Sequence, residues 1–168
     1  ATGLVLDGTD KKILLPDRED TARTVILCMG AHARPLGIPR EEEFVGAGVS
    51  YCATCDGAFF KEKAVAIVGG GDTAISDALY LSRFCSSVTV VHRRDEFRAA
   101  AVLVELAKTV PNIHFALSYI PLSLAGEKQV EGLEILDQKT AQARVLPVSG
   151  VFVAVGIVPR TELVKDLV

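Results

Sequence analysis

Two cysteines separated by two residues are the clearest candidates for chemistry in this chain. Cys52 and Cys55 are followed directly by Asp56. Cysteines at this spacing can close a small disulfide ring, and a cysteine at a helix start has its thiolate favoured by the helix dipole. A carboxyl group beside a thiolate is useful as a proton donor or relay. The pattern favours a redox disulfide, with these three residues as candidate catalytic residues.

The same pair is also compatible with half of a zinc site or with two unrelated cysteines. Zinc needs two further ligands, and the remaining cysteines and histidines contain no second close pair. Those residues are Cys28, Cys85, His32, His92 and His114. We therefore expect no metal site. Cys28 and Cys85 stand inside apolar segments, so we expect both to be buried thiols.

A glycine-rich turn follows the apolar run Ala64–Val68 and precedes a helical pattern. In a dinucleotide-binding turn, Gly69 permits the tight turn, Gly71 lets a pyrophosphate approach, and Ala74 lets the helix pack closely. The free N–H groups of the helix then face the ligand. An ordinary turn is the alternative, but the flanking strand and helix favour a nucleotide site. Its candidate residues are Gly69, Gly70, Gly71, Asp72, Thr73 and Ala74.

Basic residues stand where a dinucleotide ribose is expected, at the end of the next strand, about 20 residues further on. NAD-binding forms carry an acidic residue there, whereas this chain has His92, Arg93 and Arg94, with Arg98 shortly after. Arg binds phosphate through a planar bidentate fork, so this cluster suits the 2′-phosphate of NADPH. The alternative is a solvated basic helix start, which the helix dipole disfavours.

Alternating strand and helix patterns from residue 64 onward must position these motifs. Their order predicts a parallel sheet with right-handed crossovers, followed by an antiparallel meander and a last strand in the buried sheet. The predicted elements are strands at 64–68 and 88–91, helices at 73–84 and about 98–108, meander strands at 113–120, 129–137 and 143–148, and a last strand at 151–155. We expect an α/β fold: a Rossmann-like parallel sheet with helices on one face and an antiparallel β-meander on the other, in three layers.

The first 48 residues have a different character. Short apolar runs predict strands at 4–6, 13–15 and 24–28, with turns at Gly8 and at 17–20. Segment 30–48 contains prolines, glycines and three consecutive glutamates, which predict a connector and a domain boundary. The chain begins without an initiator Met or a secretory signal, which we interpret as a cut or processed end.

The composition disfavours several classes of partner. The 168 residues carry a net charge of −3, and 49% are apolar and 23% charged. This balance predicts a compact globular domain with no general attraction to nucleic acid or to anionic membrane surfaces. No apolar run approaches the roughly 18 residues that a membrane helix needs. We expect neither nucleic acid nor a membrane as a partner.

Three motifs, in this order and spacing, resemble the low-molecular-weight thioredoxin reductases. They are Cys52-Ala53-Thr54-Cys55-Asp56-Gly57, Gly69-Gly70-Gly71-Asp72-Thr73-Ala74 and His92-Arg93-Arg94-Asp95-Glu96-Phe97-Arg98-Ala99. The resemblance implies an NADPH-binding domain inserted between two parts of an FAD-binding domain. Residues 1–36 are then a remnant of the FAD domain and hinge, 37–150 the NADPH-binding domain with the cysteine pair, and 151–168 the return strand, where Gly156 is a further cofactor-binding candidate.

The resemblance also implies the path of the electrons. A hydride passes from NADPH to FAD, and electrons then reach the Cys52–Cys55 disulfide and finally thioredoxin. Cys55 is the flavin-proximal sulfur, Cys52 attacks the disulfide of thioredoxin, and Asp56 protonates the leaving thiolate. The parent enzyme is implied to be a cytoplasmic, homodimeric thioredoxin-disulfide reductase. The glycine fingerprint for FAD is missing, so we expect the chain by itself to bind no FAD and to be inactive.

The chain departs from the family pattern at the hinge. It has Cys28-Met29-Gly30 where Ala-Thr-Gly is usual, and Pro159-Arg160 where Pro-Asn is usual. Both departures leave the NADPH and disulfide assignments intact. Two other interpretations stay open: the flavoprotein subunit of a peroxide-reducing system, which is expected to lack the His-Arg-Arg cluster, and a stand-alone nucleotide-binding module without catalysis.

Overall fold

The computed structural model describes residues 1–6, 8–165 and 167. Asp7, Asp166 and Val168, which belong to the predicted flanking segments, lie outside the described residues. Internal contacts divide the chain into two compact units. The larger unit is Arg34–Gly156, and the smaller unit combines Ala1–Ala33 with Ile157–Val168.

A five-stranded sheet, in which all neighbours are parallel, forms the centre of the larger unit. In spatial order its strands are β5 (Val49–Ser50), β12 (Gly150–Ala154), β6 (Ala64–Gly69), β7 (Ser87–His92) and β8 (Ile113–Leu117). Four consecutive residues of β12 are buried, as expected for a strand covered on both faces. The predicted parallel sheet, including the last strand, is confirmed.

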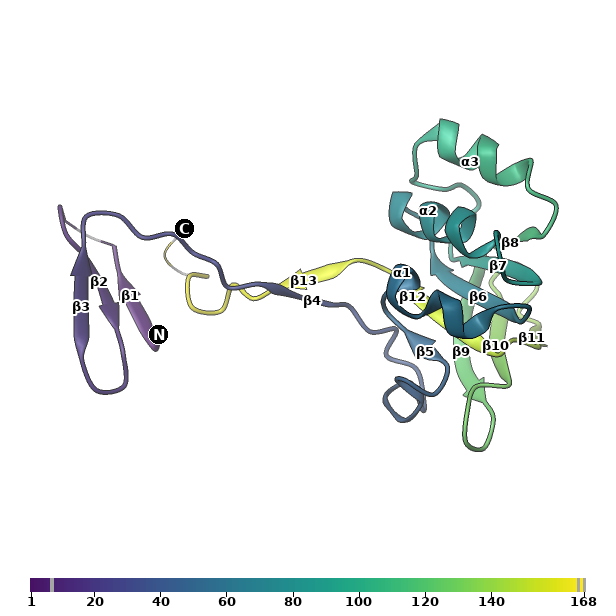
Figure 1. The fold of residues 1–168 in the computed structure, drawn as a ribbon, viewed down its shortest axis with the longest axis horizontal. Coiled ribbons are helices and arrows are strands. Elements are labelled where there is room, and N and C mark those ends of the chain that lie inside the picture. Colours follow the sequence, from purple (N-terminus) through teal and green to yellow (C-terminus); the bar gives the residue numbers. More distant parts are fainter. Residues whose placement is uncertain (7, 166, 168) are drawn as a thin grey trace. The chain divides into compact units, whose positions relative to one another are not determined.

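Two cores lie on opposite faces of this sheet because successive side chains of a strand point in opposite directions. Val65 and Ile67 of β6 pack in the core on the helical face, whereas Ala66 and Val68 pack in the core on the meander face. The helices are α2 (Asp72–Leu81) and α3 (Ala101–Lys108), and the meander strands are β9 (Tyr119–Ala125), β10 (Gly132–Asp137) and β11 (Ala143–Leu146). Figure 1 shows the helices on one side and the meander on the other, so the predicted three-layer α/β fold is confirmed.

The predicted strand at 113–120 is wrong as a single element. It comprises the end strand of the parallel sheet, β8, and the first meander strand, β9, with Ser118 between them. Ser118 has a φ of 63°, in the left-handed region that breaks an extended strand. This break lets one continuous apolar run contribute to two sheets.

The helix predicted to begin at about residue 98 begins at Ala101. Ala100 is the N-cap, with a ψ of 134° that lies outside the helical region, and the residues before it are bonded to the glycine turn. Arg98 N–H donates to the Gly70 carbonyl at 2.7 Å, and Ala100 N–H donates to the Asp72 carboxylate at 2.7 Å. Residues 93–100 therefore form a loop bonded to the glycine turn.

The described strands of the smaller unit form two antiparallel sheets. Strands β1 (Gly3–Val5), β2 (Lys11–Leu14) and β3 (Glu19–Ala22) form one sheet, and β4 (Ala31–Ala33) pairs with β13 (Ile157–Pro159). The predicted strand at 24–28 is wrong: this segment is irregular, and Ile26 is 88% exposed. The predicted turn at 17–20 is shorter, because β3 already begins at Glu19.

Short helical segments complete the larger unit. They are the helix α1 (Ala53–Asp56) and the 3-10 helices η1 (Glu42–Phe44) and η2 (Gly57–Phe60). Helices in the described part of the chain all fall short of the length and hydropathy that a membrane span requires.

Candidate functional site

The two cysteines of the first motif form a disulfide, with their Cα atoms 5.3 Å apart. Strand β5 ends just before Cys52, which caps the N-terminus of α1. The Cys55 N–H donates a hydrogen bond of 3.2 Å to Cys52 Sγ. A backbone N–H at this position stabilises negative charge on the sulfur that accepts its hydrogen bond. Cys55 is exposed and Cys52 half-buried, which leaves the disulfide accessible from outside the unit.

A buried hydroxyl fixes the carboxyl group beside this disulfide. Ser50, which is 5% exposed, donates a hydrogen bond of 2.6 Å to Asp56 Oδ2. The Cys52 N–H donates to the same hydroxyl oxygen at 3.1 Å. The Asp56 side chain is therefore held next to the start of the helix that carries both sulfurs.

The two other cysteines differ in environment. Cys85 is buried, and burial raises the pKa of its thiol to about 11, so it carries little thiolate at neutral pH. Cys28 is exposed. The prediction of a buried Cys28 is wrong. Its segment forms no strand, and its side chain is left exposed by the described residues of the smaller unit.

The three glycines of the turn are required for different reasons. A Cβ atom at Gly69 would overlap the Ala154 carbonyl of β12, and one at Gly70 would overlap the His92 ring. A Cβ atom at Gly71 would meet nothing within 4 Å. Packing therefore explains the first two glycines, whereas the open space at Gly71 leaves room for a ligand close to the backbone.

The helix that follows the turn is well placed to receive an anion. Gly71 occupies the N-cap position of α2 and has no side chain to cap the first N–H groups. Ala74 is fully buried against the sheet, which brings the helix close to β6. These free N–H groups at the carboxyl end of a central parallel strand have the arrangement that binds dinucleotide phosphates.

The basic residues of the third motif lie in a loop directly after β7. Arg93, Arg94 and Arg98 are all exposed, and none has an ion-pair partner among the described residues. Their guanidinium groups are therefore available for a phosphate. Exposed cations that stay unpaired beside a nucleotide-type turn fit a 2′-phosphate better than they fit a structural role.

His92 has a structural role in this loop. Its ring is 7% exposed, stacks on Phe97 with ring centres 5.5 Å apart, and lies 3.1 Å from the Glu96 carbonyl through Nε2. Burial lowers the pKa of His92, and the neighbouring arginines lower it further. His92 is therefore neutral at neutral pH and packs beneath the turn at Gly70.

The structure thus joins the second and third motifs into one surface, whereas the disulfide belongs to a different helix, α1. Gly57, directly after α1, packs against Leu81 and Phe84 at the end of α2. Phe152 of β12 pairs with Ser50 of β5 on one side and with Ile67 of β6 on the other. The disulfide and the nucleotide turn therefore follow the carboxyl ends of two strands of the same sheet, with β12 between them.

Gly156 is not brought into either centre by the contacts of the larger unit. It has a φ of 108°, and its carbonyl accepts a hydrogen bond of 3.0 Å from the Arg34 N–H. These two residues are the ends of the larger unit. The predicted cofactor contact of Gly156 stays a prediction.

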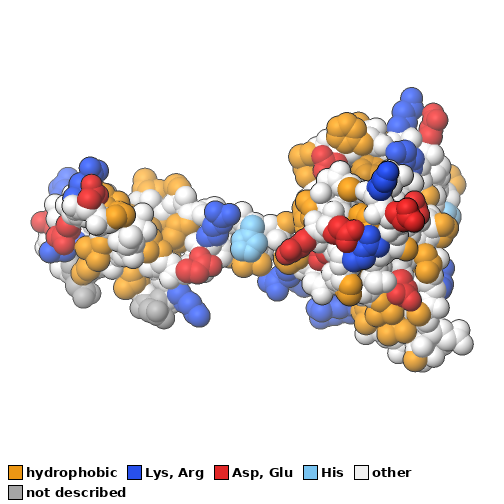
Figure 2. Space-filling model, turned by 90° about the horizontal axis from the view of Figure 1, so that it is seen from below, with side chains coloured by type: hydrophobic (Ala, Val, Ile, Leu, Met, Phe, Trp, Pro, Cys, Tyr) orange, Lys and Arg blue, Asp and Glu red, His pale blue; other side chains and the backbone are white. Residues whose placement is uncertain are grey.

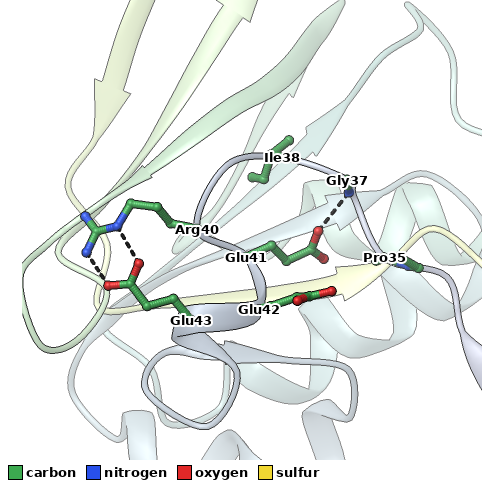
Figure 3. A pocket seen from close by; sticks show the side chains of 7 residues that line it. All are labelled: Pro35, Gly37, Ile38, Arg40, Glu41, Glu42 and Glu43. Atoms are coloured by element: carbon green, nitrogen blue, oxygen red, sulfur yellow. Dashed lines mark hydrogen bonds and ion pairs between the residues drawn. The ribbon is translucent and has the colours of Figure 1, made fainter.

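The connector forms a cavity of about 310 Å³ that contains none of the predicted site residues. Figure 3 shows the Glu41 carboxylate pointing back to Gly37 and Arg40 forking onto Glu43. Glu41 is 3% exposed and also accepts from the Tyr51 hydroxyl at 2.8 Å. Burial and this hydrogen bond raise the pKa of Tyr51 to about 12. These contacts fasten the connector to the residue before Cys52.

Charges are mixed over the larger unit. On the face in Figure 2, basic and acidic side chains alternate without a broad area of one sign. No group of three or more His, Cys, Asp or Glu side chains arranged for a metal ion occurs among residues 1–6, 8–165 and 167.

Several supporting residues were not predicted from the sequence. Ser50 holds Asp56, and Ser118 and Lys139 hold Asp95 of the arginine loop. Each lies far from its motif or carries a side chain too common to signal a role. Only the left-handed backbone of Ser118 marks it as unusual, and that is visible only in three dimensions.

Comparison with known proteins defines the class. Residues 3–168 match the family described as pyridine nucleotide-disulphide oxidoreductase. The disulfide and the glycine turn described above agree with this description. The chain belongs to the pyridine nucleotide-disulphide oxidoreductase family.

Individual relatives are named thioredoxin reductases. The chain is 46% identical over 163 residues to one from Mycolicibacterium smegmatis, covering 97% of this chain and 52% of the relative. It is 48% identical over 147 residues to a bifunctional thioredoxin reductase/thioredoxin from Mycobacterium leprae, covering 88% of this chain and 32% of the relative.

Solved structures show the same likeness. The thioredoxin reductase of Lactococcus lactis aligns with a TM-score of 0.90 at 40% identity, covering 99% of this chain and 55% of that chain. The thioredoxin reductase of T. acidophilum aligns with a TM-score of 0.87 at 30% identity, covering 98% of this chain and 54% of that chain. The chain spans about half the length of the relatives that it matches.

Proposed function

We propose that this chain supplies the NADPH-binding surface and the redox disulfide of a thioredoxin reductase. The observation that carries the proposal is that one folded unit holds an accessible disulfide and a glycine turn bonded to a loop of unpaired arginines, both after the carboxyl ends of strands in one parallel sheet. The relatives named thioredoxin reductase share this part of the chain.

NADPH is the proposed ligand of the glycine turn and the arginine loop. The N–H groups at the start of α2, with open space at Gly71, suit the pyrophosphate. Arg93, Arg94 and Arg98 are the proposed partners of the 2′-phosphate. Each charge-assisted hydrogen bond to a phosphate contributes about 1.5 to 3 kcal/mol when it is shielded from solvent, and less when exposed.

The segments of the smaller unit, Ala1–Ala33 and Ile157–Val168, are proposed to belong to an FAD-binding domain, and residues 151–156 are the return strand that leads to it from the unit that binds NADPH. When bound, NADPH supplies a hydride, and the flavin relays its electrons to a disulfide. We propose that this chain alone does not retain FAD and lacks reductase activity. The role left to its own residues is to bind the nucleotide and to exchange a disulfide.

Thioredoxin is the proposed recipient. The Cys52 thiolate attacks the disulfide of the partner, one partner sulfur leaves as a thiolate, and Asp56 donates the proton that this thiolate takes up. Cys55 then returns its thiol proton to the Asp56 carboxylate, and the resulting Cys55 thiolate attacks Cys52 Sγ in the mixed disulfide, which restores the Cys52–Cys55 bond and releases the second partner sulfur as a thiolate. The balance is one disulfide formed and one reduced. A homodimeric parent enzyme in the cytoplasm remains part of this proposal.

Trapping of the mixed disulfide tests the proposal on this chain. A thioredoxin with a single active-site cysteine, activated as its mixed disulfide with thionitrobenzoate, is offered to the reduced chain. Exposed Cys28 is first replaced by Ser, so that it cannot compete. In that background, Cys55→Ser should release thionitrobenzoate and form a one-to-one covalent complex through Cys52, at least tenfold faster than Cys52→Ser does. Equal rates, or a faster Cys52→Ser chain, contradict the assignment.

A further inference from the structure

The loop that carries the arginines is fixed at both of its ends. Its second half is bonded to the glycine turn through Arg98 N–H and Ala100 N–H. Its first half is bonded to the opposite side of the sheet, at the junction of β8 and β9. There the Ser118 N–H donates to the Arg94 carbonyl at 3.1 Å, and the Ser118 hydroxyl donates to the Asp95 carboxylate.

Ser118 is built into this junction. It is 6% exposed, and its backbone adopts a left-handed φ of 63° that a residue other than glycine seldom adopts. Its carbonyl accepts a hydrogen bond of 2.9 Å from the Gln138 N–H. All its polar groups are thus used between the arginine loop and the turn that joins β10 to β11.

A lysine side chain from that turn forms an ion pair with the Asp95 carboxylate. Lys139 Nζ lies 2.8 Å from Asp95 Oδ1. The turn is fixed by Asp137, whose Oδ1 accepts from the N–H groups of Lys139 at 2.8 Å and Thr140 at 3.3 Å. The position of Lys139 is therefore set by the backbone of the meander.

We propose that Ser118 and Lys139 are positioning residues for the 2′-phosphate site: through Asp95, the meander orients Arg93 and Arg94 and thereby sets the preference for NADPH over NADH. This inference rests on the proposed function. Asp95 directly follows the two arginines, so an unpaired carboxylate there would both repel a phosphate and draw the arginines onto itself. Lys139 and Ser118 engage it instead.

The titration of Asp95 agrees with this arrangement. Hydrogen bonds from Lys139 and Ser118 hold the pKa of Asp95 below its usual range, so this carboxylate is ionised at neutral pH. The side chains of Lys139 and Asp95 are 64% and 62% exposed. The ion pair between them therefore contributes a modest free energy that decreases as salt is added.

Calorimetric titration of the full chain with NADPH and with NADH tests the inference. Lys139→Ala should lower the preference for NADPH by up to about fivefold, as expected for an exposed pair. Ser118→Gly keeps the left-handed backbone accessible and removes the hydroxyl. It should lower the preference by about threefold to tenfold. In both variants the affinity for NADH should stay nearly constant.

Two matched controls separate positioning from general stability. Ser123→Ala removes a hydroxyl that donates to a carboxylate, that of Glu134, at 2.7 Å within the same meander. Lys108→Ala removes an exposed ion pair of the same 2.8 Å length to Glu105. Both should leave the ratio of the two affinities unchanged.

The outcomes are distinct. If the unmodified chain prefers NADPH and the Ser118 and Lys139 variants keep its ratio, this inference is overturned and the proposed function stands. If the unmodified chain binds both nucleotides equally, both are overturned. A lower ratio in the two variants, with unchanged controls, supports the inference.

Discussion

The Ser50 hydroxyl donates a hydrogen bond of 2.6 Å to the Asp56 carboxylate, across the turn that carries the redox disulfide. Because the Cys52 N–H donates to the same oxygen, one buried side chain fixes both the proposed proton donor and the first sulfur. Strand β5 is only two residues long, yet it places this hydroxyl.

Replacement of Ser50 should therefore lower the free energy of unfolding more than replacement of a serine whose hydroxyl donates to a neutral acceptor. Ser50→Ala removes a bond to a charged acceptor, which contributes about 1.5 to 3 kcal/mol, whereas a bond to a neutral acceptor contributes about 0.5 to 1.5 kcal/mol. Ser82→Ala is the matched control, because its hydroxyl donates to the neutral Leu79 carbonyl at 2.9 Å. Urea unfolding of the oxidised chain measures both, and equal losses would contradict the role of Ser50.

Adjacent glycines of the turn should respond differently to the same substitution. Gly70→Ala forces a methyl group onto the His92 ring and should lower the free energy of unfolding by about 2 kcal/mol or more. Gly71→Ala meets open space in the chain, so it should leave stability unchanged and weaken NADPH binding at least tenfold, or about 1.4 kcal/mol. Thermal unfolding and calorimetry distinguish the two effects. Unchanged NADPH binding by the Gly71 variant would argue against a pyrophosphate there.

Acid should destabilise the larger unit through His92. Burial lowers its pKa in the folded state, so its contribution to stability is present above its unfolded pKa of about 6.5. As the pH falls below that value, His92 of the unfolded chain binds a proton before His92 of the folded chain does. The free energy of unfolding therefore decreases until the pH reaches the pKa of His92 in the folded state. His92→Gln should reduce this pH dependence in urea unfolding between about pH 7.5 and 5.5. His114→Gln, at an exposed position, should leave it as it was.

The two unpaired cysteines should react at very different rates. Exposed Cys28 should be alkylated by iodoacetamide under native conditions, whereas burial and the raised pKa of Cys85 should protect it at least a hundredfold at about pH 8. Mass spectrometry of peptides after timed alkylation, without reductant, gives both rates. Comparable labelling of the two would show that Cys85 is not held in a closed core.

Sequence periodicity predicted the layers of the larger unit because the burial of its strands follows their alternation. In β6, Val65 and Ile67 face the helices, and Ala66 and Val68 face the meander. The glycine turn was equally predictable, since its neighbours must be a strand and a helix.

Elements that depend on distant partners were not predictable. Residues 24–28 have β-branched side chains typical of a strand, but a strand also needs a hydrogen-bonding neighbour, and the described residues provide none. The break at Ser118 has no local signal, because serine seldom adopts a left-handed φ. The sequence predicted the motif residues of the candidate site but not the residues that hold them in place, which are Ser50, Ser118 and Lys139.

The central claim is that the arginines of the loop bind the 2′-phosphate of NADPH. Two charge-assisted contacts correspond to about 3 to 6 kcal/mol, or roughly a hundredfold to ten-thousandfold in affinity, with solvent exposure favouring the lower end. Arg93→Ala combined with Arg94→Ala should remove most of this factor for NADPH and leave NADH almost unchanged. Arg83→Ala, which removes an exposed arginine after α2, should change neither.

Calorimetric titration of the unmodified chain with NADPH and NADH, at one stated salt concentration, tests this claim most directly. The account predicts that NADPH binds at least about a hundredfold more tightly. Equal affinity for the two nucleotides would contradict it, and would mean that Arg93, Arg94 and Arg98 are only a solvated face of the loop.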